Sequence, residues 1–172
     1  IYSVNGSPTF SKCEFSSNHS DAIGGVMYFT GAGEVNIDQC NFMNNTSTQA
    51  TSVIFSEGGI RIVASRSIFK NNHTEFGAAL YFQSTAVVKH SIDNCLFIDN
   101  TIVPLSDAEA STILSFDTTI ITNCNFYNSA AITGLETIAV EILGNMFNCI
   151  FHGKNNMAVS SAHMKIYNSI VQ

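Results

Sequence analysis

A short phrase recurs along this chain at an almost constant interval. It begins with Cys or Ser, has Phe two residues later and ends on Asn. Its starts are 27, 27 and 28 residues apart, and weaker copies begin at Cys124 and Cys149. A fixed period of this length is typical of stacked repeats. The clear copies are Cys13-Glu14-Phe15-Ser16-Ser17-Asn18, Cys40-Asn41-Phe42-Met43-Asn44-Asn45, Ser67-Ile68-Phe69-Lys70-Asn71-Asn72 and Cys95-Leu96-Phe97-Ile98-Asp99-Asn100.

The composition agrees with a folded domain that carries few charges. Of 172 residues, 45% are hydrophobic and 12% are charged, with a formal net charge of −6. We expect residues 1–172 to form a single domain. Because Lys and Arg never form a run, nucleic acid is not an expected partner. No apolar stretch approaches the roughly 20 residues of a membrane-spanning helix.

The pattern inside each repeat predicts short parallel strands. Cys and Phe stand two residues apart, so a strand points both toward the same face. Midway between phrases come apolar segments that begin with small residues, such as Gly24-Gly25-Val26-Met27-Tyr28-Phe29 and Gly77-Ala78-Ala79-Leu80-Tyr81-Phe82. The sequence therefore predicts an all-β fold, a right-handed parallel β-helix of about six turns of roughly 27 residues. Neither the Leu pattern of a leucine-rich repeat nor the hairpin signals of a propeller occur.

In such a coil, equivalent residues of neighbouring turns lie about 4.8 Å apart and form columns. The inward aromatic column is expected to contain Phe15, Phe42, Phe69, Phe97, Phe126 and Phe151. An inward column of small residues should contain Cys13, Cys40, Ser67, Cys95, Cys124 and Cys149. A corner column of Asn18, Asn45, Asn72 and Asn100 is expected to adopt left-handed backbone and to bond amides above and below. Ser129 and Lys154 replace Asn in the last two phrases.

The combination of FxxN with a small-residue and apolar segment resembles the repeat of the polymorphic outer-membrane protein family. It reads Phe15-Ser16-Ser17-Asn18 followed by Gly24-Gly25-Val26-Met27, and Phe69-Lys70-Asn71-Asn72 followed by Gly77-Ala78-Ala79-Leu80. The resemblance covers nearly the whole chain. It implies a repeat-built surface structure outside the cell that adheres to a partner or forms a coat.

The five cysteines are not expected to form a reactive site. No two are closer than 25 residues, whereas zinc ligands usually come in close pairs. All occupy one phase of the repeat, so they should point inward as free, inert thiols without disulfides. We expect no catalytic, metal or cofactor site.

Acidic and histidine residues are scattered rather than clustered. Asp38 and Asp93 share one repeat position, which Ser65 and Thr122 also occupy, and we interpret this column as facing solvent. Asp107 and Glu109 could bind a cation or a partner, but an ordinary acidic loop is the simpler interpretation. Two of the five histidines, His19 and His73, directly follow a corner Asn and should lie exposed at the corners. The other three, His90, His152 and His163, share no position in the repeat.

Five sequons for N-linked glycosylation occur, at Asn5, Asn18, Asn44, Asn45 and Asn72. A corner Asn cannot both join the inward amide column and carry a glycan. Asn5 and Asn44 are therefore the better acceptors, and they would fit a secreted chain.

The leading hypothesis is a non-enzymatic extracellular domain that is structural or adhesive, within a surface protein, coat or filament. Ile1 to Val4 and Tyr167 to Gln172 both resemble strands of a longer or assembling helix, so self-association through terminal strands is expected. A surface glycan or a protein is the other expected partner. The alternative is a polysaccharide-binding or polysaccharide-cleaving β-helix similar to pectate lyase, which should align acidic, basic or aromatic side chains outward on neighbouring turns.

Overall fold

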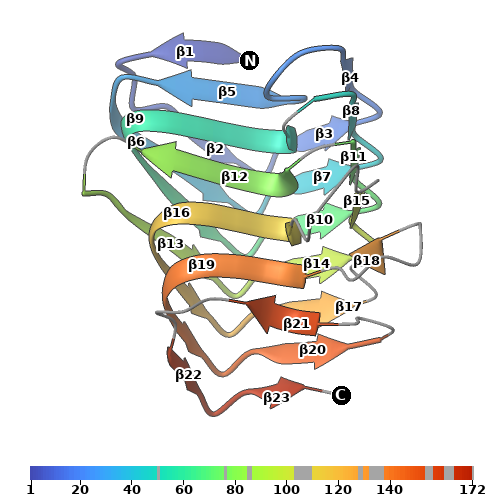
Figure 1. Ribbon diagram of the computed structural model, residues 1–172. Helices are drawn as coiled ribbons and strands as arrows, with labels where there is room; N and C mark the ends of the chain where they lie inside the picture. Colours follow the sequence, from blue (N-terminus) through green and yellow to red (C-terminus); the bar gives the residue numbers. More distant parts are fainter. Residues whose placement is uncertain are drawn as a thin grey trace.

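The computed structural model describes residues 1–49, 51–75, 77–84, 87–102, 110–127, 130–131, 138–153, 157–160 and 165–171. All regular elements in these ranges are β-strands, and the strand pairs are parallel. The chain coils into a parallel β-helix whose turns lie one above the other (Figure 1). The first and last described turns lie at opposite ends of this stack.

Each turn contributes strands to three sheets. The largest sheet has eleven strands, and its long members continue around a corner, so that each of them pairs with two short strands of a neighbouring turn. Its main path is β1 (Tyr2–Val4), β5 (Met27–Thr30), β9 (Thr51–Ser65), β12 (Ala78–Ser84), β16 (Ala110–Thr122), β19 (Ile138–Phe147) and β21 (Met157–Ser160). Beside this path lie β2 (Thr9–Ser11), β6 (Ala32–Asp38), β13 (Lys89–Asp93) and β22 (Lys165–Tyr167).

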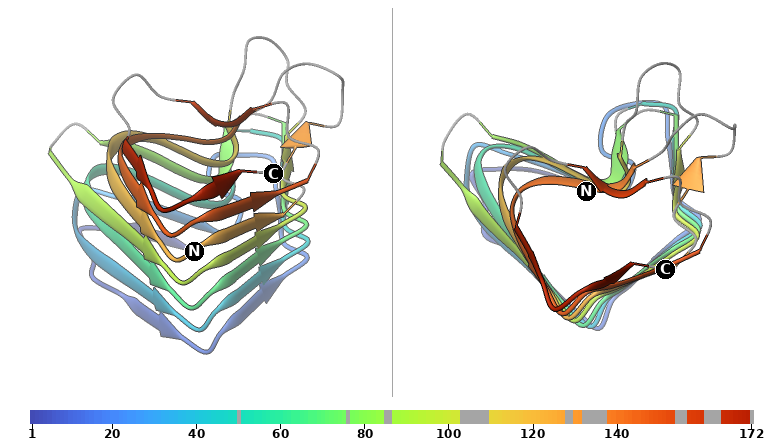
Figure 2. Two further views of the ribbon diagram at one scale, coloured as in Figure 1. Left: turned by 90° about the horizontal axis from the view of Figure 1, so that it is seen from below. Right: turned by 60° about the horizontal axis from the view of Figure 1, so that its bottom comes forward.

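Two smaller sheets form the other sides (Figure 2). The second sheet stacks β3 (Glu14–Ser16), β7 (Asn41–Met43), β10 (Ile68–Lys70), β14 (Leu96–Ile98), β17 (Asn125–Tyr127), β20 (Ile150–His152) and β23 (Ile170–Val171). The third stacks β4 (His19–Ser20), β8 (Thr46–Ser47), β11 (His73–Thr74), β15 (Thr101–Ile102) and β18 (Ala130–Ala131). The β-helix has about four turns, slightly fewer than the six expected, and its second sheet extends further along the axis than its third.

The corners are formed by residues with left-handed backbone. One set directly precedes the Cys or Ser of each phrase and includes Gln39 and Arg66, with φ of 54° and 48°. The other directly precedes the corner Asn and consists of Ser17, Asn44, Asn71 and Asp99, with φ from 49° to 56°. The prediction that Asn18, Asn45, Asn72 and Asn100 themselves adopt this backbone is wrong. The bend is made one residue earlier, which leaves the corner Asn free to point inward.

A continuous apolar core fills the coil. Inward residues from Val26 to Phe151 join one cluster, which includes Met27, Ile54 and Leu80 from the largest sheet and Phe42 and Phe97 from the second. Strand register stacks like residues on one another, as in Met27 opposite Ile54 and Ile54 opposite Leu80. Because the interior is filled by side chains, any functional surface must lie on the outward faces or at the ends.

Candidate functional site

The Phe column is a single stack of rings inside the second sheet. Neighbouring rings from Phe15 to Phe151 have centroids 4.6–4.9 Å apart and planes within 10° of parallel. Phe42, Phe69, Phe97 and Phe126 are fully buried. The six rings thus occupy the positions expected from the phrase, and all except the half-buried Phe15 are closed to a substrate.

The small-residue column closes the corner before each strand of the second sheet. Cys40 Sγ donates to the Asp38 carbonyl at 3.4 Å, and Ser67 Oγ donates to the Ser65 carbonyl at 2.8 Å. The Ser67 hydroxyl also accepts from the Cys40 backbone N–H of the preceding turn at 3.1 Å. Thiol and hydroxyl are therefore interchangeable here because either can satisfy the backbone.

All five cysteines are free thiols. Cys40, Cys95, Cys124 and Cys149 are buried, and Cys13 is half-buried. Burial raises the pKa of the Cys40, Cys124 and Cys149 thiols. A protonated thiol is a poor nucleophile and a poor metal ligand, so this column has a structural role.

The small-residue column has a seventh member that the sequence analysis missed. Ser169 Oγ donates to the Tyr167 carbonyl at 2.9 Å and accepts from the Cys149 N–H at 3.1 Å. No Phe follows Ser169, since Val171 pairs with Phe151 in the register. The Asn-Ser pair at 168–169, 20 residues after Asn148-Cys149, was the available signal.

The Asn column is a chain of amide hydrogen bonds along the helix axis. Asn45 Nδ2 donates to Asn72 Oδ1 and Asn72 Nδ2 donates to Asn100 Oδ1, both at 2.9 Å. Asn18 Nδ2 donates to Asn45 Oδ1 at 2.8 Å. Each Oδ1 also accepts the backbone N–H of the Asn one turn earlier. Ser129 and Lys154 lie outside the described residues.

A buried histidine and aspartate pair was not identified from sequence. His90 and Asp117 have side chains 0% and 5% exposed, and Nε2 of His90 lies 3.1 Å from Asp117 Oδ2. The Ile62 N–H donates to His90 Nδ1 at 3.1 Å, so Nδ1 is unprotonated and Nε2 donates to the carboxylate. Burial lowers the pKa of His90. The ring packs on Phe82 and does not reach solvent, which makes the pair structural. Its sequence signal was the position two residues before the inward Ile92.

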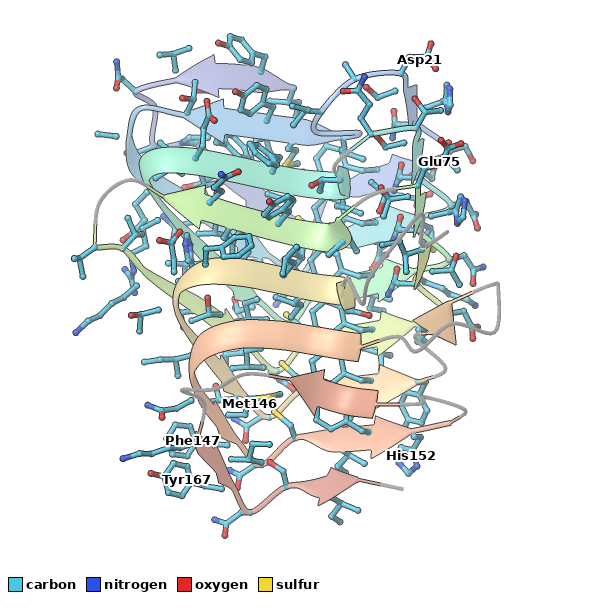
Figure 3. The ribbon with its side chains drawn as sticks, in the orientation of Figure 1. Asp21, Glu75, Met146, Phe147, His152 and Tyr167 are labelled. Carbon is cyan, nitrogen blue, oxygen red and sulfur yellow. The ribbon has the colours of Figure 1, made fainter. Side chains whose placement is uncertain are left out.

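The other described histidines lie on the outside. His19 is exposed, with Nδ1 2.8 Å from Thr46 Oγ1 and Nε2 3.0 Å from Asp21 Oδ1. His73 is half-buried and bonds Thr101 Oγ1 at 2.9 Å. His152 projects from β20 in Figure 3 and stacks on Tyr127. Asp107, Glu109 and the fifth histidine, His163, lie outside the described residues.

The acidic column is a hydrogen-bonded row on the outer surface. Asp38 and Asp93 lie opposite Ser65 in the register, and Asp93 also lies opposite Thr122. Ser65 Oγ donates to Asp38 Oδ1 at 2.7 Å, and Thr122 Oγ1 donates to Asp93 Oδ1. The Arg66 guanidinium bonds both oxygens of Asp38 and lowers the pKa of that carboxyl. Because Asp38 and Asp93 are bonded to hydroxyl and guanidinium groups, they do not form the pair of carboxyl groups that acid and base catalysis would use.

The clearest candidate binding surface is an aromatic row on the outward face of the largest sheet. It consists of Tyr2, Tyr28, Phe55, Tyr81 and Phe116, from β1, β5, β9, β12 and β16. The first four are direct neighbours in the register, and adjacent centroids are 5.2–5.3 Å apart in edge-to-face contact. Phe116 lies 5.9 Å from Tyr81. This face is turned toward the viewer in Figures 1 and 3.

Exposure differs along the aromatic row. Tyr2 and Phe116 are 66% and 55% exposed, whereas Tyr28 and Tyr81 are half-buried and cover Phe55, which is 4% exposed. The Tyr28 hydroxyl donates to Glu57 Oε1 at 2.6 Å, and this bond raises the pKa of Tyr28 to about 12. The row therefore offers apolar ring area beside a hydroxyl and a carboxylate. Tyr28 and Tyr81 occupy the same position in the two apolar segments that begin at Gly24 and Gly77, and the buried Met27 and Phe29 on either side of Tyr28 show that it points outward.

Among the described residues, no group of three or more His, Cys, Asp or Glu side chains could hold a metal ion. A search of the described part of the chain also finds no helix that is long and apolar enough to cross a membrane. Comparison of the chain with protein-family models, with curated proteins and with solved structures finds no match.

Proposed function

We propose that this chain is a non-enzymatic, structural and adhesive β-helix domain of an extracellular surface protein, coat or filament. The observation that carries the adhesive part is the outward aromatic row, because exposed aromatic side chains provide large contact area at low entropic cost. The Cys, Phe and Asn columns support the structural part, since their polar and apolar groups are used in stacking the turns.

Binding by the aromatic row can be tested with a double variant. Tyr2→Ala/Phe116→Ala removes the two most exposed rings without opening the core, and Tyr127→Ala on the second sheet is the matched control. Adhesion of the protein to cell surfaces or extracellular matrix should fall at least about tenfold in the double variant, which corresponds to about 1.4 kcal/mol, and should be unchanged in the control. Equal adhesion of all three proteins would refute the role of the row.

The edges of the stack support self-association as part of the same proposal. In the described residues, β1 pairs only with β5, and β22 pairs only with β19. Both turns carry exposed apolar side chains, which include Tyr2 and Val4 at one end and Ile166 and Ile170 at the other. Such edges pair with further turns of a longer chain or with a second copy. Sedimentation velocity over a wide concentration range should show growing species, and one monomeric species throughout would oppose assembly through the ends.

Polysaccharide binding is the second candidate, and the aromatic row specifically favours it. Apolar ring area next to hydroxyl and carboxylate groups suits a sugar polymer, which combines apolar C–H surfaces with hydroxyl groups. A glycan array should then give binding that Tyr28→Ala weakens, together with a turnover assay on each bound glycan. Binding without cleavage would identify the ligand of an adhesive domain, cleavage would replace the non-enzymatic proposal, and no binding would leave a protein partner.

A further inference from the structure

Five sequons compete for N-linked glycosylation, and the hydrogen bonds of their side-chain amides separate them. A glycan is attached through Nδ2, so the acceptor must have a free Nδ2 and open space around it. Asn45 Nδ2 already donates to the Phe15 carbonyl at 3.0 Å and to Asn72 Oδ1 at 2.9 Å. Asn72 Nδ2 donates to the Phe42 carbonyl and to Asn100 Oδ1. Both asparagines are fully buried, which makes them incompatible with a glycan in the folded chain.

Asn18 is exposed, but its Nδ2 is also used within the amide column. It donates to Asn45 Oδ1 at 2.8 Å and to the Ser16 carbonyl at 3.4 Å. Substitution of this nitrogen would remove one of these bonds and crowd the next asparagine. The three sequons whose asparagine belongs to the amide column are thus disfavoured by the fold itself.

Asn44 has the opposite arrangement. It is exposed, and its left-handed backbone, with φ of 56°, turns the side chain away from the core at the corner. Its Oδ1 accepts from Asn71 Nδ2 of the following turn at 3.3 Å, so the amide nitrogen is directed away from that turn. Ser16 pairs with Met43 in the register, so the next residue, Ser17, is the counterpart of Asn44 in the preceding turn. Ser17 is small and exposed. This corner leaves room for a glycan.

We propose that Asn44 is the principal acceptor of an N-linked glycan and that Asn45 and Asn72 are not acceptors. Asn5 is the second site, because its side chain is exposed and its Oδ1, rather than its Nδ2, accepts a hydrogen bond of 2.9 Å from the Ala32 N–H. The inference uses the extracellular location in the proposed function but is independent of the adhesive role. It assigns the outer corner between β7 and β8 to the modification.

The modification needs a glycosyl donor that the secretory machinery supplies. The donor is an oligosaccharide joined through its anomeric carbon to a lipid-linked diphosphate. A bond forms between Asn44 Nδ2 and the anomeric carbon, while the bond from that carbon to the diphosphate oxygen breaks. The diphosphate leaves with the electron pair of the broken bond. Nδ2 loses one proton to a base of the secretory machinery that transfers the glycan.

The overlapping sequons provide a built-in control. Asn44→Gln removes the acceptor but leaves Asn45-Thr46-Ser47 complete, so any remaining glycan at this corner must be on Asn45. The whole chain is secreted from eukaryotic cells, and its intact mass is measured before and after endoglycosidase. Asn44→Gln should lose one glycan relative to wild type, and Asn5→Gln/Asn44→Gln should lose both.

Peptide mapping of the wild-type protein tests the assignment without relying on any variant. A peptide N-glycosidase hydrolyses the side-chain amide and so converts a glycosylated Asn to Asp, and the mapped Asp should lie at position 44. Occupancy of Asn45 or Asn72 would overturn the inference, as would secreted, folded protein with no glycan at Asn44. Loss of adhesion without loss of the glycan, or the reverse, would separate failure of the proposed function from failure of this site.

Discussion

At the scale of single residues, the turns are joined by side chains that act as backbone partners. Asn72 is the clearest case, because its amide makes bonds to Phe42, Asn100 and Asn45. The sequence was sufficient to predict that these asparagines would stack. It was not sufficient to place the left-handed residue, because Ser17, Asn44, Asn71 and Asp99 are all small polar residues that tolerate this backbone.

Removal of one amide from the middle of the Asn column should be costly. We expect Asn72→Ala to lower the free energy of unfolding by at least about 3 kcal/mol, because several buried polar groups lose their partners. Asn18→Ala is the matched control at the exposed end of the column, where we expect about 1 kcal/mol or less. Urea denaturation measures both, and equal losses would contradict the importance of burial.

The His90 and Asp117 pair should make stability depend on pH. Burial lowers the folded-state pKa of His90, whereas the unfolded value is about 6.5. Between these two values the unfolded state binds more protons, so stability is full above about pH 6.5 and falls by up to about 1.4 kcal/mol per pH unit below it. Protonation also turns Nδ1 into a donor that faces the Ile62 N–H.

The non-titrating variant His90→Gln should remove most of this slope in denaturation measured from pH 7.5 to 5. The carboxyls of Glu34 and Asp38 have lowered pKa values because of Arg61 and Arg66, respectively. Their contribution is lost only as the pH falls below about 4.5, outside this window. An unchanged slope in His90→Gln would assign the effect to other groups.

At the scale of elements, the strands could be predicted from the phrase but their continuity could not. The sequence pattern separates the apolar segment that precedes Ser67 from the segment midway between phrases, whereas β9 joins both into one strand from Thr51 to Ser65. The joint depends on glycine, since Gly58 has φ of 77° at the corner. The alternation of apolar and polar residues along a strand does not indicate where the strand bends.

Gly33, the second residue of β6, allows a test of backbone geometry. Gly33 has φ of 147°, and a Cβ there would collide with the Gly6 carbonyl. We expect Gly33→Ala to lower stability by about 1–3 kcal/mol. Gly59→Ala, at a neighbouring position of the next turn, would place its Cβ 3.4 Å from the Gly31 carbonyl and should change stability by about 0.5 kcal/mol or less. Thermal unfolding compares the two, and similar losses would show that local strain is not the cause.

The Phe column should respond to truncation according to depth. Phe97→Ala leaves a cavity between Phe69 and Phe126, so we expect a loss of about 3–5 kcal/mol. Phe15 has one stacked neighbour in the column and is half-buried, so Phe15→Ala should cost less than half as much. Chemical denaturation of the two variants decides this, and a larger loss at Phe15 would be inconsistent with the stack.

At the scale of the whole molecule, the period predicted the parallel β-helix because stacking is a property of the repeat as a unit. The aromatic row was harder to find, since it depends on which way each residue of a second, less regular segment points. The buried His90 was missed for a related reason: its partners Ile62 and Asp117 belong to the turns before and after it, and pairing across turns depends on register.

Stability should vary along the helix axis. Each turn contacts only its neighbours, so a central turn is held on both sides and an outer turn on one. Hydrogen exchange should therefore be slowest for the amides of β7, β10 and β14 and fastest for those of β1, β22 and β23. Uniform protection measured by mass spectrometry would indicate that the turns unfold only together.

The Phe stack also shows that distance along the axis is independent of residue number. Phe69 and Phe97 are 28 positions apart, Phe97 and Phe126 are 29, and Phe126 and Phe151 are 25, yet the rings are spaced by 4.9, 4.8 and 4.6 Å. Val87, in the 28-residue interval between Phe69 and Phe97, is 94% exposed and lies outside the stack. The length of the molecule along its axis is therefore set by the number of repeats and not by the number of residues. A gene that gains or loses a whole repeat changes this length, whereas one that lengthens the segment between two phrases changes only the width of the protein.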